Sequence, residues 1–380
     1  MAGNFTYISL SDLPDDYSTK IKSNPDEILK QCKTSKQFEQ GALGKLEPIP
    51  WPLFLERIFG NAFYIGLHLV PTTLMAYGAC KLMDLPWGAS QVIETASIGV
   101  FTYLVALGGA CVVTKTLQGP FLSKTDSVTL SMRNTEKFLS IRAIWPPSCA
   151  PEKMRDTPAI YCAVPHGMVP SGVWSPFFRL WASKAFRWTA APIVFQLPFI
   201  SYWFYQAGFM PAKGPQIKKE LTDKKHSVGV ILDGVAGIFS DKLDAEKQRK
   251  ERVFMRERKG VVAIALQTGA PLVPVYMFGH TDMYTVLTDP FGIIEGVSCK
   301  LNMALAPFVG LWGFPLGPPR RRPILLAFGD PIQIPKNPTG AKPSSEEVDK
   351  YHEMLVQGVI SVFETHKAAY GWPDKQLEVI

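Results

Sequence analysis

One histidine stands in a sequence context that suits chemistry. His166 lies between Pro165 and Gly167, directly after the apolar run 158–164. Proline fixes the backbone angle φ and glycine permits a sharp turn, so this tripeptide predicts a turn at the end of a buried strand. A helix is expected to begin at Met168, and catalytic side chains commonly lie at such strand-to-helix junctions of α/β sheets. The alternative interpretation is a histidine with a purely structural role.

A glycine-rich loop is the second feature that could take part in chemistry. Residues 231–239 predict a strand followed by a loop that contains Asp233, Gly234 and Gly237. Successive backbone N–H groups in a loop of this kind can bind an anion. The loop is therefore a candidate source of hydrogen bonds to a negatively charged oxygen.

A basic cluster follows further along the chain. Arg256, Arg258 and Lys259 lie at the start of an apolar run, 258–271, which predicts a buried helix that stops at Gly269. Such a cluster can receive phosphate groups. A solvated charged face is the alternative, and the sequence alone leaves both open.

An α/β domain must position these residues. Its last helix is expected over 343–371, where Ser344 and Glu347 make a capping box and Gly371 ends the helix. Buried strands of a sheet covered on both faces read as continuous apolar runs. Four runs of this type predict strands: 158–164, 227–233, 271–278 and 322–328.

Two uncharged runs predict a transmembrane helical hairpin. Residues 60–80 and 95–114 are each long enough to cross a hydrocarbon layer of about 30 Å as a helix. A pair of buried helices in a protein core is the alternative. Basic residues on both sides of the hairpin place both termini in the cytosol. The predicted organisation is a cytosolic N-terminal tail over 1–55, the hairpin over 56–114 and the α/β domain over 115–380.

The composition narrows the class of protein. Hydrophobic residues make up 47% of the chain, and its formal net charge is +7. A mildly basic, aromatic-rich chain suits membrane surfaces and phosphorylated ligands, whereas no zinc-knuckle spacing or long basic helix indicates a nucleic-acid partner. The six cysteines contain no Cys-x-x-Cys pair, so the sequence indicates neither a disulfide framework nor a metal site and fits a reducing compartment.

Several motifs in a fixed order carry a resemblance to one family. The sequence resembles the type-2 acyl-CoA:diacylglycerol acyltransferases and their monoacylglycerol and wax-alcohol relatives over roughly residues 50–380. The resemblance implies an α/β fold in which the N-terminal transmembrane hairpin precedes a mixed-sheet domain of the glycerol-phosphate acyltransferase type. The segments that carry it are 165–167 (PHG), 258–279 (RKGVVAIALQTGAPLVPVYMFG), 323–335 (PILLAFGDPIQIP) and 351–371 (YHEMLVQGVISVFETHKAAYG).

The resemblance implies acyl transfer from acyl-CoA to the free hydroxyl of a diacylglycerol. An imidazole with an ordinary pKa near 6.5 suits the general base that takes the hydroxyl proton, which assigns this role to His166. N–H groups of Gly167 or of the Gly234–Gly237 loop are candidate donors to the oxyanion. Acyl-CoA is a substrate here, no metal or redox cofactor is implied, and the CoA phosphates are assigned to Arg256, Arg258 and Lys259.

The chain departs from the family pattern at several positions. The usual His-Pro-His-Gly begins here with Val164, and Ser171 stands where the wider superfamily has an aspartate. The usual Gly-Gly-x-x-Glu becomes the segment Asp233–Gly237, which loses the glutamate and gains an aspartate. We therefore hypothesise that Asp233 orients or charges His166, with His280 as a second-choice partner.

Alternative functions stay open at this point. The same chemistry could use a monoacylglycerol, a long-chain alcohol or a sterol as acceptor, and a catalytically silent, membrane-anchored lipid-binding scaffold is a further reading. Two apolar stretches, 188–212 and 301–319, could line the path of the lipid chains or belong to the core. The expected location is the endoplasmic-reticulum membrane, with both termini cytosolic and with the lipid droplet as a further site. The expected partners are both substrates, membrane lipid and, by analogy, a second copy of the chain.

Overall fold

The computed structural model describes most of the chain outside the predicted hairpin. The described residues are 4–49, 126–196, 201, 204–205, 207–239, 250–287, 292–301, 306–313, 318–335 and 342–380. All structural statements below concern these residues.

Among the described residues, nine strands form one mixed sheet in the order β2-β1-β3-β12-β9-β4-β7-β5-β6. Strand β4 lies near the middle and runs parallel to β9 on one side and to β7 on the other. The antiparallel pairs are β1–β2, β1–β3 and β9–β12. The strands are β1 (Phe5–Ser9), β2 (Lys33–Ser35), β3 (Arg142–Trp145), β4 (Ile160–Val164), β5 (Phe186–Ala190), β6 (Met210–Pro211), β7 (Ser227–Ile231), β9 (Leu272–Phe278) and β12 (Leu325–Phe328).

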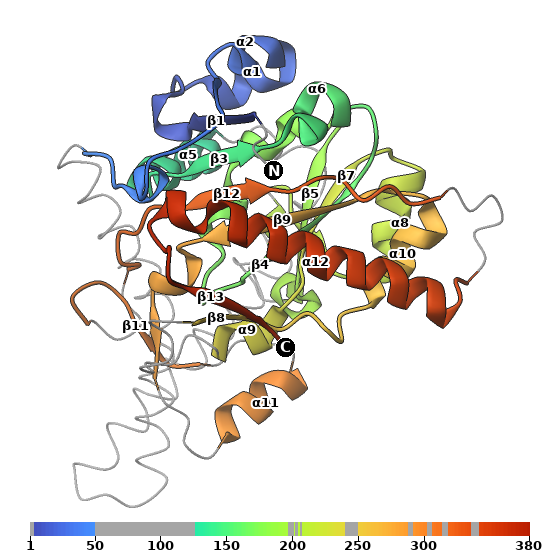
Figure 1. Ribbon diagram of the computed structural model, residues 1–380. Coiled ribbons are helices and arrows are strands. Elements are labelled where there is room, and N and C mark those ends of the chain that lie inside the picture. The colour runs from blue at the N-terminus through green and yellow to red at the C-terminus, as the bar shows by residue number, and fades with distance from the viewer. Residues whose placement is uncertain are drawn as a thin grey trace, which may run out of the picture.

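Three α-helices cover one face of the sheet. These are α8 (Gly214–Thr222), α10 (Gly260–Thr268) and α12 (Ser345–Tyr370), and their apolar side chains pack with those of the strands in one buried cluster. Figure 1 shows α12 running across the front of the sheet, with α8 and α10 beside it. The Ser344 hydroxyl accepts from the Glu347 amide at 3.1 Å, and Gly371 ends the helix at a φ of 108°. The predicted capping box and helix end are therefore confirmed.

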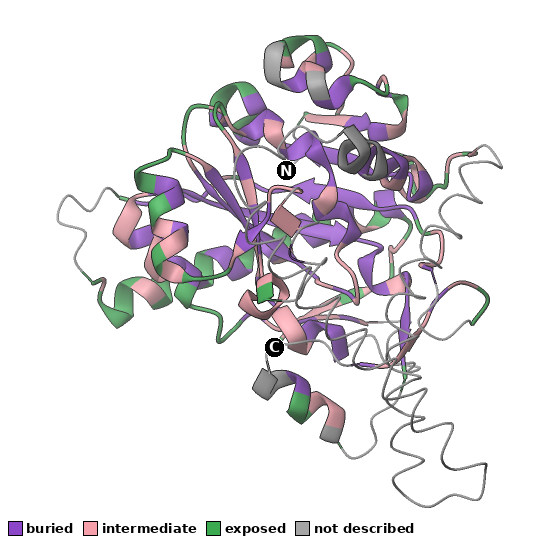
Figure 2. Ribbon diagram, turned by 180° about the vertical axis from the view of Figure 1, so that it is seen from behind, coloured by how far each residue is buried: buried purple, intermediate pink, exposed green. Residues whose placement is uncertain are grey.

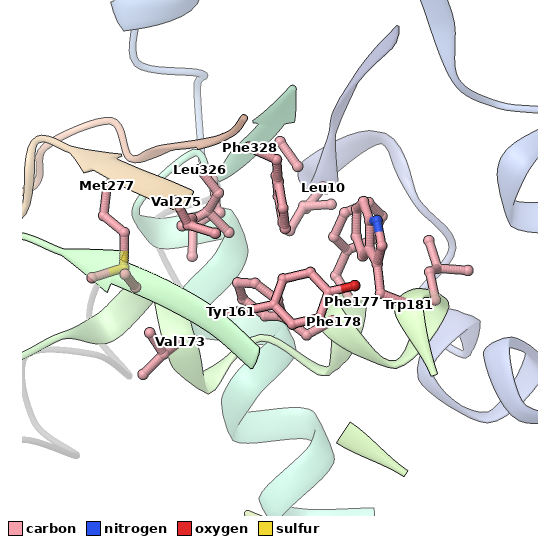
Figure 3. Close-up of a cluster of buried hydrophobic side chains, with 14 of the residues drawn as sticks. Leu10, Tyr161, Val173, Phe177, Phe178, Trp181, Val275, Met277, Leu326 and Phe328 are labelled. Carbon is pink, nitrogen blue, oxygen red and sulfur yellow. The ribbon is translucent and has the colours of Figure 1, made fainter. Parts of the chain in front are cut away.

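The opposite face is covered by short helices and an aromatic cluster. The Trp181 ring stacks on Phe328 with 4.4 Å between centroids, and Tyr161 and Phe178 pack around the same ring pair (Figure 3). In Figure 2 the strands of the sheet are buried along most of their length. The covering elements include α1 (Tyr17–Ser23), α2 (Pro25–Leu29), α5 (Asp126–Phe138), α6 (Pro151–Met154), and the 3-10 segments η1 (Leu10–Asp12), η4 (Pro147–Cys149), η5 (Ser171–Trp174), η6 (Pro176–Trp181) and η7 (Pro192–Gln196).

Smaller elements complete the described fold. Strand β8 (Lys250–Val253) pairs parallel with β13 (Gln376–Val379), and β10 (Thr285–Val286) pairs antiparallel with β11 (Phe308–Val309). In Figure 1, α9 and the β8–β13 pair lie together below α12, and α11 lies beyond them. The remaining helical segments are α9 (Gly234–Phe239), α11 (Ile293–Leu301), η2 (Ala42–Gly44), η8 (His280–Asp282) and η9 (Leu311–Gly313).

The four strands predicted from apolar runs and the helix predicted before Gly269 are confirmed. They correspond to β4, β7, β9, β12 and α10. Gly269 ends α10 at a φ of 70°, a left-handed conformation that glycine adopts without a steric penalty.

The predicted transmembrane hairpin needs a correction. In the described ranges, no helix combines the length and the apolarity that crossing a bilayer requires. The α/β fold with a mixed sheet is thus seen without a membrane-spanning hairpin, and the residues of that hairpin, 56–114, lie outside the described residues. The prediction rested on the length of the two runs, on their lack of charge and of a polar face, and on the short turn between them. These sequence properties do not by themselves separate a spanning helix from other buried apolar segments. The placement of both termini in the cytosol depended on the same hairpin.

The N-terminal segment also differs from its prediction. Residues 4–49 do not form a separate tail, because β1 and β2 extend the main sheet beyond β3. Buried Arg133 donates to the carbonyl groups of Leu10 and Leu13 and pairs with Glu136 at 3.2 Å. Polar composition suggested a solvated tail, but strand pairing and these hydrogen bonds tie the segment to the domain.

Candidate active site

His166 lies where the sequence places it, just beyond the carboxyl end of β4. Val164 pairs with Tyr276 of β9 at the end of the strand, and Pro165 follows. Gly167 has a φ of 59°, and a Cβ atom there would lie 2.6 Å from the carbonyl oxygen of His280. Only glycine fits this turn, for both reasons. No α-helix follows: the expected helix from Met168 is replaced by the 3-10 segments η5 and η6, because Pro170 and Pro176 interrupt regular helical hydrogen bonding.

Asp233 lies beside this turn because β7 is the direct neighbour of β4 in the sheet. Its two carboxylate oxygens accept the backbone N–H of His166 at 3.0 and 2.9 Å. The side chain is fully buried, and this burial raises the pKa of Asp233 to about 7, against the opposing effects of the His166 amide and the charge of Arg258. A Cβ atom at Gly237 would clash with the carboxylate, so a glycine is required there.

The contact differs from the hypothesis that Asp233 orients the imidazole directly. The carboxylate holds the main chain of His166, whereas the imidazole Nδ1 lies 2.6 Å from the carbonyl oxygen of Gly167. Since a carbonyl can only accept, Nδ1 carries the proton in this arrangement, and Nε2 of the neutral ring has a free lone pair. No described residue donates a hydrogen bond to Nε2.

The protonation state of His166 follows from its surroundings. Burial lowers the pKa of His166 from its ordinary value of 6.5, and the Gly167 carbonyl opposes this effect. The residue is only partly covered and keeps some of its surface exposed. A neutral imidazole with an accessible lone pair is the form that a general base needs near neutral pH.

The three backbone amides predicted as oxyanion donors differ in whether they already have a hydrogen-bond partner. The Gly237 amide donates to the Asp233 carbonyl oxygen at 3.2 Å, within the first turn of α9. The Gly234 amide faces the Asp233 carboxylate and lowers its pKa. The amide of Gly167 has no hydrogen-bond partner among the described residues. The predicted glycine loop is a short helix, and Gly167 is the predicted donor that is not engaged.

The basic cluster lies on the surface between β8 and α10. Lys259 pairs with Asp349 at 2.7 Å, and Arg256 donates to the carbonyl oxygen of Val379 at 3.1 Å. Arg258 is exposed and forms no ion pair within the described part of the chain, yet its charge lowers the pKa of buried Asp233. Because its charge acts on Asp233, Arg258 lies near the carboxyl edge of the sheet, where His166 also lies. Among the described residues, no partner forms a hydrogen bond or ion pair with the Arg258 side chain.

His280 and Gly172 form a contact that the sequence did not predict. His280 is fully buried in η8, and its Nε2 accepts the backbone N–H of Gly172 at 3.1 Å. Burial lowers the pKa of His280 to about 3, so the ring is neutral. The available signal was a histidine separated by one residue, Gly279, from the end of the buried strand β9, but the role considered for it was a direct partnership with His166.

Together these groups can perform proton transfer beside a hydrogen-bond donor. The base nitrogen of His166, the free Gly167 amide and the Arg258 charge occupy one edge of the sheet. No three His, Cys, Asp or Glu side chains in the described ranges are grouped to hold a metal ion.

Comparison with known proteins identifies related sequences. The family model for diacylglycerol acyltransferases matches residues 153–380. The chain is 29% identical over 236 residues to human diacylglycerol O-acyltransferase 2-like protein 6, covering 56% of this chain and 67% of that protein. It is 30% identical over 227 residues to bovine 2-acylglycerol O-acyltransferase 1, covering 56% and 66%, and 29% identical over 195 residues to bovine diacylglycerol O-acyltransferase 2, covering 48% and 52%. The matches thus span about half to two thirds of these relatives.

Proposed function

Because the chain belongs to the diacylglycerol acyltransferase family and is an O-acyltransferase, we propose that it transfers a fatty acyl group from acyl-CoA to the free hydroxyl of a diacylglycerol. Membership of this family supports an acyl-CoA acyltransferase activity whose acceptor is a diacylglycerol, a monoacylglycerol or a wax alcohol. The choice of diacylglycerol, with triacylglycerol as product, follows the description of the matched family.

The state of the His166 ring is the observation that carries the proposal. Nδ1 is committed to the Gly167 carbonyl at 2.6 Å, which directs the lone pair to Nε2. The lowered pKa of His166 keeps this nitrogen unprotonated at neutral pH. An alcohol needs such a base because its hydroxyl is a weak nucleophile until its proton is removed.

The reaction balances with His166 as a proton carrier. The imidazole Nε2 takes the hydroxyl proton while the alcohol oxygen bonds to the thioester carbon. The resulting oxyanion is stabilised by the Gly167 amide, which no described residue engages. The carbon–sulfur bond then breaks, and the CoA thiolate takes the proton from the imidazolium. The products are an ester and CoA, and His166 returns to its neutral form.

Two further residues have supporting roles in the proposal. Asp233 is a positioning residue that holds the His166 amide, as its two hydrogen bonds of 3.0 and 2.9 Å support. Arg258 receives a CoA phosphate, whereas Lys259 is already paired with Asp349 and Arg256 is tied to a carbonyl. An exposed arginine presents a planar fork that matches phosphate geometry.

Water-insoluble substrates set the place of action. A diacylglycerol and a triacylglycerol reside in membranes and in lipid droplets, so we propose that the enzyme works at the surface of the endoplasmic-reticulum membrane and of lipid droplets. An aromatic group extends from Trp174, which follows the His166 loop, to Phe195 and Phe204, and it packs on buried Phe209. We propose that its partly exposed rings, Trp174, Phe195 and Phe204, contact acyl chains. Formation of a homodimer stays a prediction.

Ester formation in a clean lipid background tests the proposal. Membranes from a yeast strain that makes no neutral lipid, expressing the chain, are incubated with labelled oleoyl-CoA and a panel of acceptors. Labelled triacylglycerol is expected, and His166→Ala should lower its rate by about 10²–10⁴. His226→Ala is the matched control, because His226 contacts Glu220 instead of the site. Labelled ester from a different acceptor would replace the proposed substrate, and no ester from any acceptor would favour a lipid-binding scaffold.

A further inference from the structure

The loop that carries His166 is in contact with a second imidazole, that of His280. His280 lies against the loop formed by residues 165–172. Its Nε2 accepts the Gly172 amide at 3.1 Å, and its main-chain carbonyl and Cβ atom pack against Gly167. Gly172 is equally close, because a Cβ atom there would lie 2.7 Å from Nε2 of the same ring. One buried residue therefore contacts the loop near both ends, with its ring at Gly172 and with its carbonyl group and Cβ atom at Gly167.

The protonation of this ring follows from its partners. Nε2 accepts from an amide, so it has no proton, and the proton of the neutral ring is on Nδ1. Nδ1 has no hydrogen-bond partner with good geometry among the described residues, although the nearby Pro165 carbonyl raises the pKa of the ring. Burial and, at pH values where His166 is protonated, the charge of that ring act in the opposite direction and dominate, giving His280 a pKa of about 3. His280 is therefore fixed as a neutral acceptor throughout the physiological range.

Neighbouring contacts fix the position of His280 itself. Gly279 has a φ of 87°, and a Cβ atom there would clash with the Pro323 carbonyl and the Tyr370 hydroxyl, so β9 must turn at this residue. After His280, the Thr281 hydroxyl donates to buried Glu251 at 3.0 Å. Glu251 in turn pairs with Lys375 at 2.6 Å. These contacts fix the main chain on both sides of His280, so its ring can restrict the movement of the loop.

We propose that His280 is a positioning residue that braces the loop 165–172 from within and thereby keeps the imidazole of His166 in its reactive orientation. The inference rests on the proposed function, since the effect on catalysis passes through His166. It assigns His280 no contact with substrate. Misplacement of a catalytic group by about 1 Å can lower a rate by about 10²-fold, so a brace of this kind has a measurable effect on turnover.

Paired variants separate bracing from general stability. In His280→Leu the acceptor for the Gly172 amide is lost, whereas in His280→Gln the side-chain carbonyl can occupy the position of Nε2. His366→Leu is the matched control, because His366 is a buried imidazole on α12 that packs edge-on against Phe5, 4.8 Å away. Each variant is purified as the full chain in detergent. Its melting temperature, its kinetics and the hydrogen–deuterium exchange of the peptide covering 166–174 are then measured.

The expected pattern is specific to a brace. His280→Leu should lower kcat about 10- to 100-fold with the KM for acyl-CoA changed by less than about twofold, and should speed exchange of the 166–174 amides. His280→Gln should restore most of kcat and of the amide protection. His366→Leu should lose a comparable amount of thermal stability with normal kcat and unchanged loop exchange.

Two results would overturn the inference. One is a His280→Leu enzyme with normal kcat and normal loop exchange, and the other is a glutamine variant no better than the leucine variant in both measurements. Failure of the proposed function is distinguishable, because it would appear as no ester from the unaltered chain or as full activity in His166→Ala. The amide exchange still tests the brace in that case.

Discussion

Replacing Asp233 by asparagine gives the most direct test of how the buried carboxylate holds the turn that carries His166. The change keeps an oxygen that can accept the His166 amide but removes the titratable charge. In the folded protein, burial raises the pKa of Asp233 from 3.8 to about 7. The folded state therefore binds a proton that the unfolded chain has already released, and stability falls as pH rises between these two values.

The magnitude follows from the size of the shift. Each pH unit well between the unfolded and the folded pKa costs about 1.4 kcal/mol, and about half of that near the folded pKa. Raising the pH from 5 to 7 should therefore remove about 2 kcal/mol from the wild-type protein. Asp233→Asn lacks this titration. Its stability relative to wild type should rise by the same amount over that range, and it should level off above pH 7.

Thermal unfolding in detergent at a series of pH values is the assay, with ester formation measured on the same samples. Asp233→Ala serves as the control, because it also lacks the charge but leaves the His166 amide without an acceptor, at a cost of about 1–3 kcal/mol. If the lost hydrogen bond displaces the loop that carries His166, Asp233→Ala should lower the rate of ester formation about 10- to 100-fold, and Asp233→Asn should lower it much less. A wild-type and an Asn variant with parallel pH profiles would refute the buried-carboxylate reasoning. Near-native rates in both variants, with His166→Ala inactive, would reduce Asp233 to a structural role.

Three further predictions concern the surroundings of the site. Arg258→Gln should raise the KM for acyl-CoA several-fold with little change in kcat. Lys259→Gln should leave this KM unchanged, because Lys259 is already paired with Asp349. Equal effects of the two substitutions would contradict the assignment of the phosphate to Arg258. Gly237→Ala should destabilise the protein by about 1–3 kcal/mol and slow ester formation, because the added methyl group clashes with the Asp233 carboxylate. An unchanged melting temperature would show that the backbone around residue 237 moves to accommodate the methyl group. Deleting residues 1–49 should abolish cooperative unfolding. The deletion removes β1 and β2 from the sheet and leaves buried Arg133 without the Leu10 and Leu13 carbonyl acceptors. A truncated chain that still unfolds in a sharp transition would show that the segment is dispensable.

The central part of the fold was predictable from the sequence because burial on both sides leaves a strong local signal. The runs that became β4, β7, β9 and β12 are continuous and apolar, and the ends of α10 and α12 carry glycine where the left-handed conformation is needed. The order of strands is a different matter. Nothing local to residues 5–9 indicates that β1 pairs with β3, more than a hundred positions away, because the partner is chosen by packing of the whole domain.

The candidate site shows the same division at the level of single residues. That His166 and Asp233 meet could be anticipated, since each follows a buried strand and the carboxyl ends of neighbouring parallel strands lie at one edge. Which atoms meet could not. A carboxylate can accept a hydrogen bond from an imidazole or from a backbone amide, and the residue types do not decide between them. In the folded chain Asp233 accepts from the His166 amide.

This geometry changes how the missing acidic partner of the histidine should be understood. An aspartate bonded to Nδ1 would fix the tautomer and stabilise the imidazolium by its charge. Here the neutral Gly167 carbonyl fixes the same tautomer at 2.6 Å, and the Asp233 charge is one step removed, on the main-chain amide. In the mechanism proposed above, the imidazolium would form with less electrostatic support and would return its proton readily to the CoA thiolate. The Gly167 carbonyl thus fixes the tautomer of the ring, while the Asp233 carboxylate holds the main chain of the same residue.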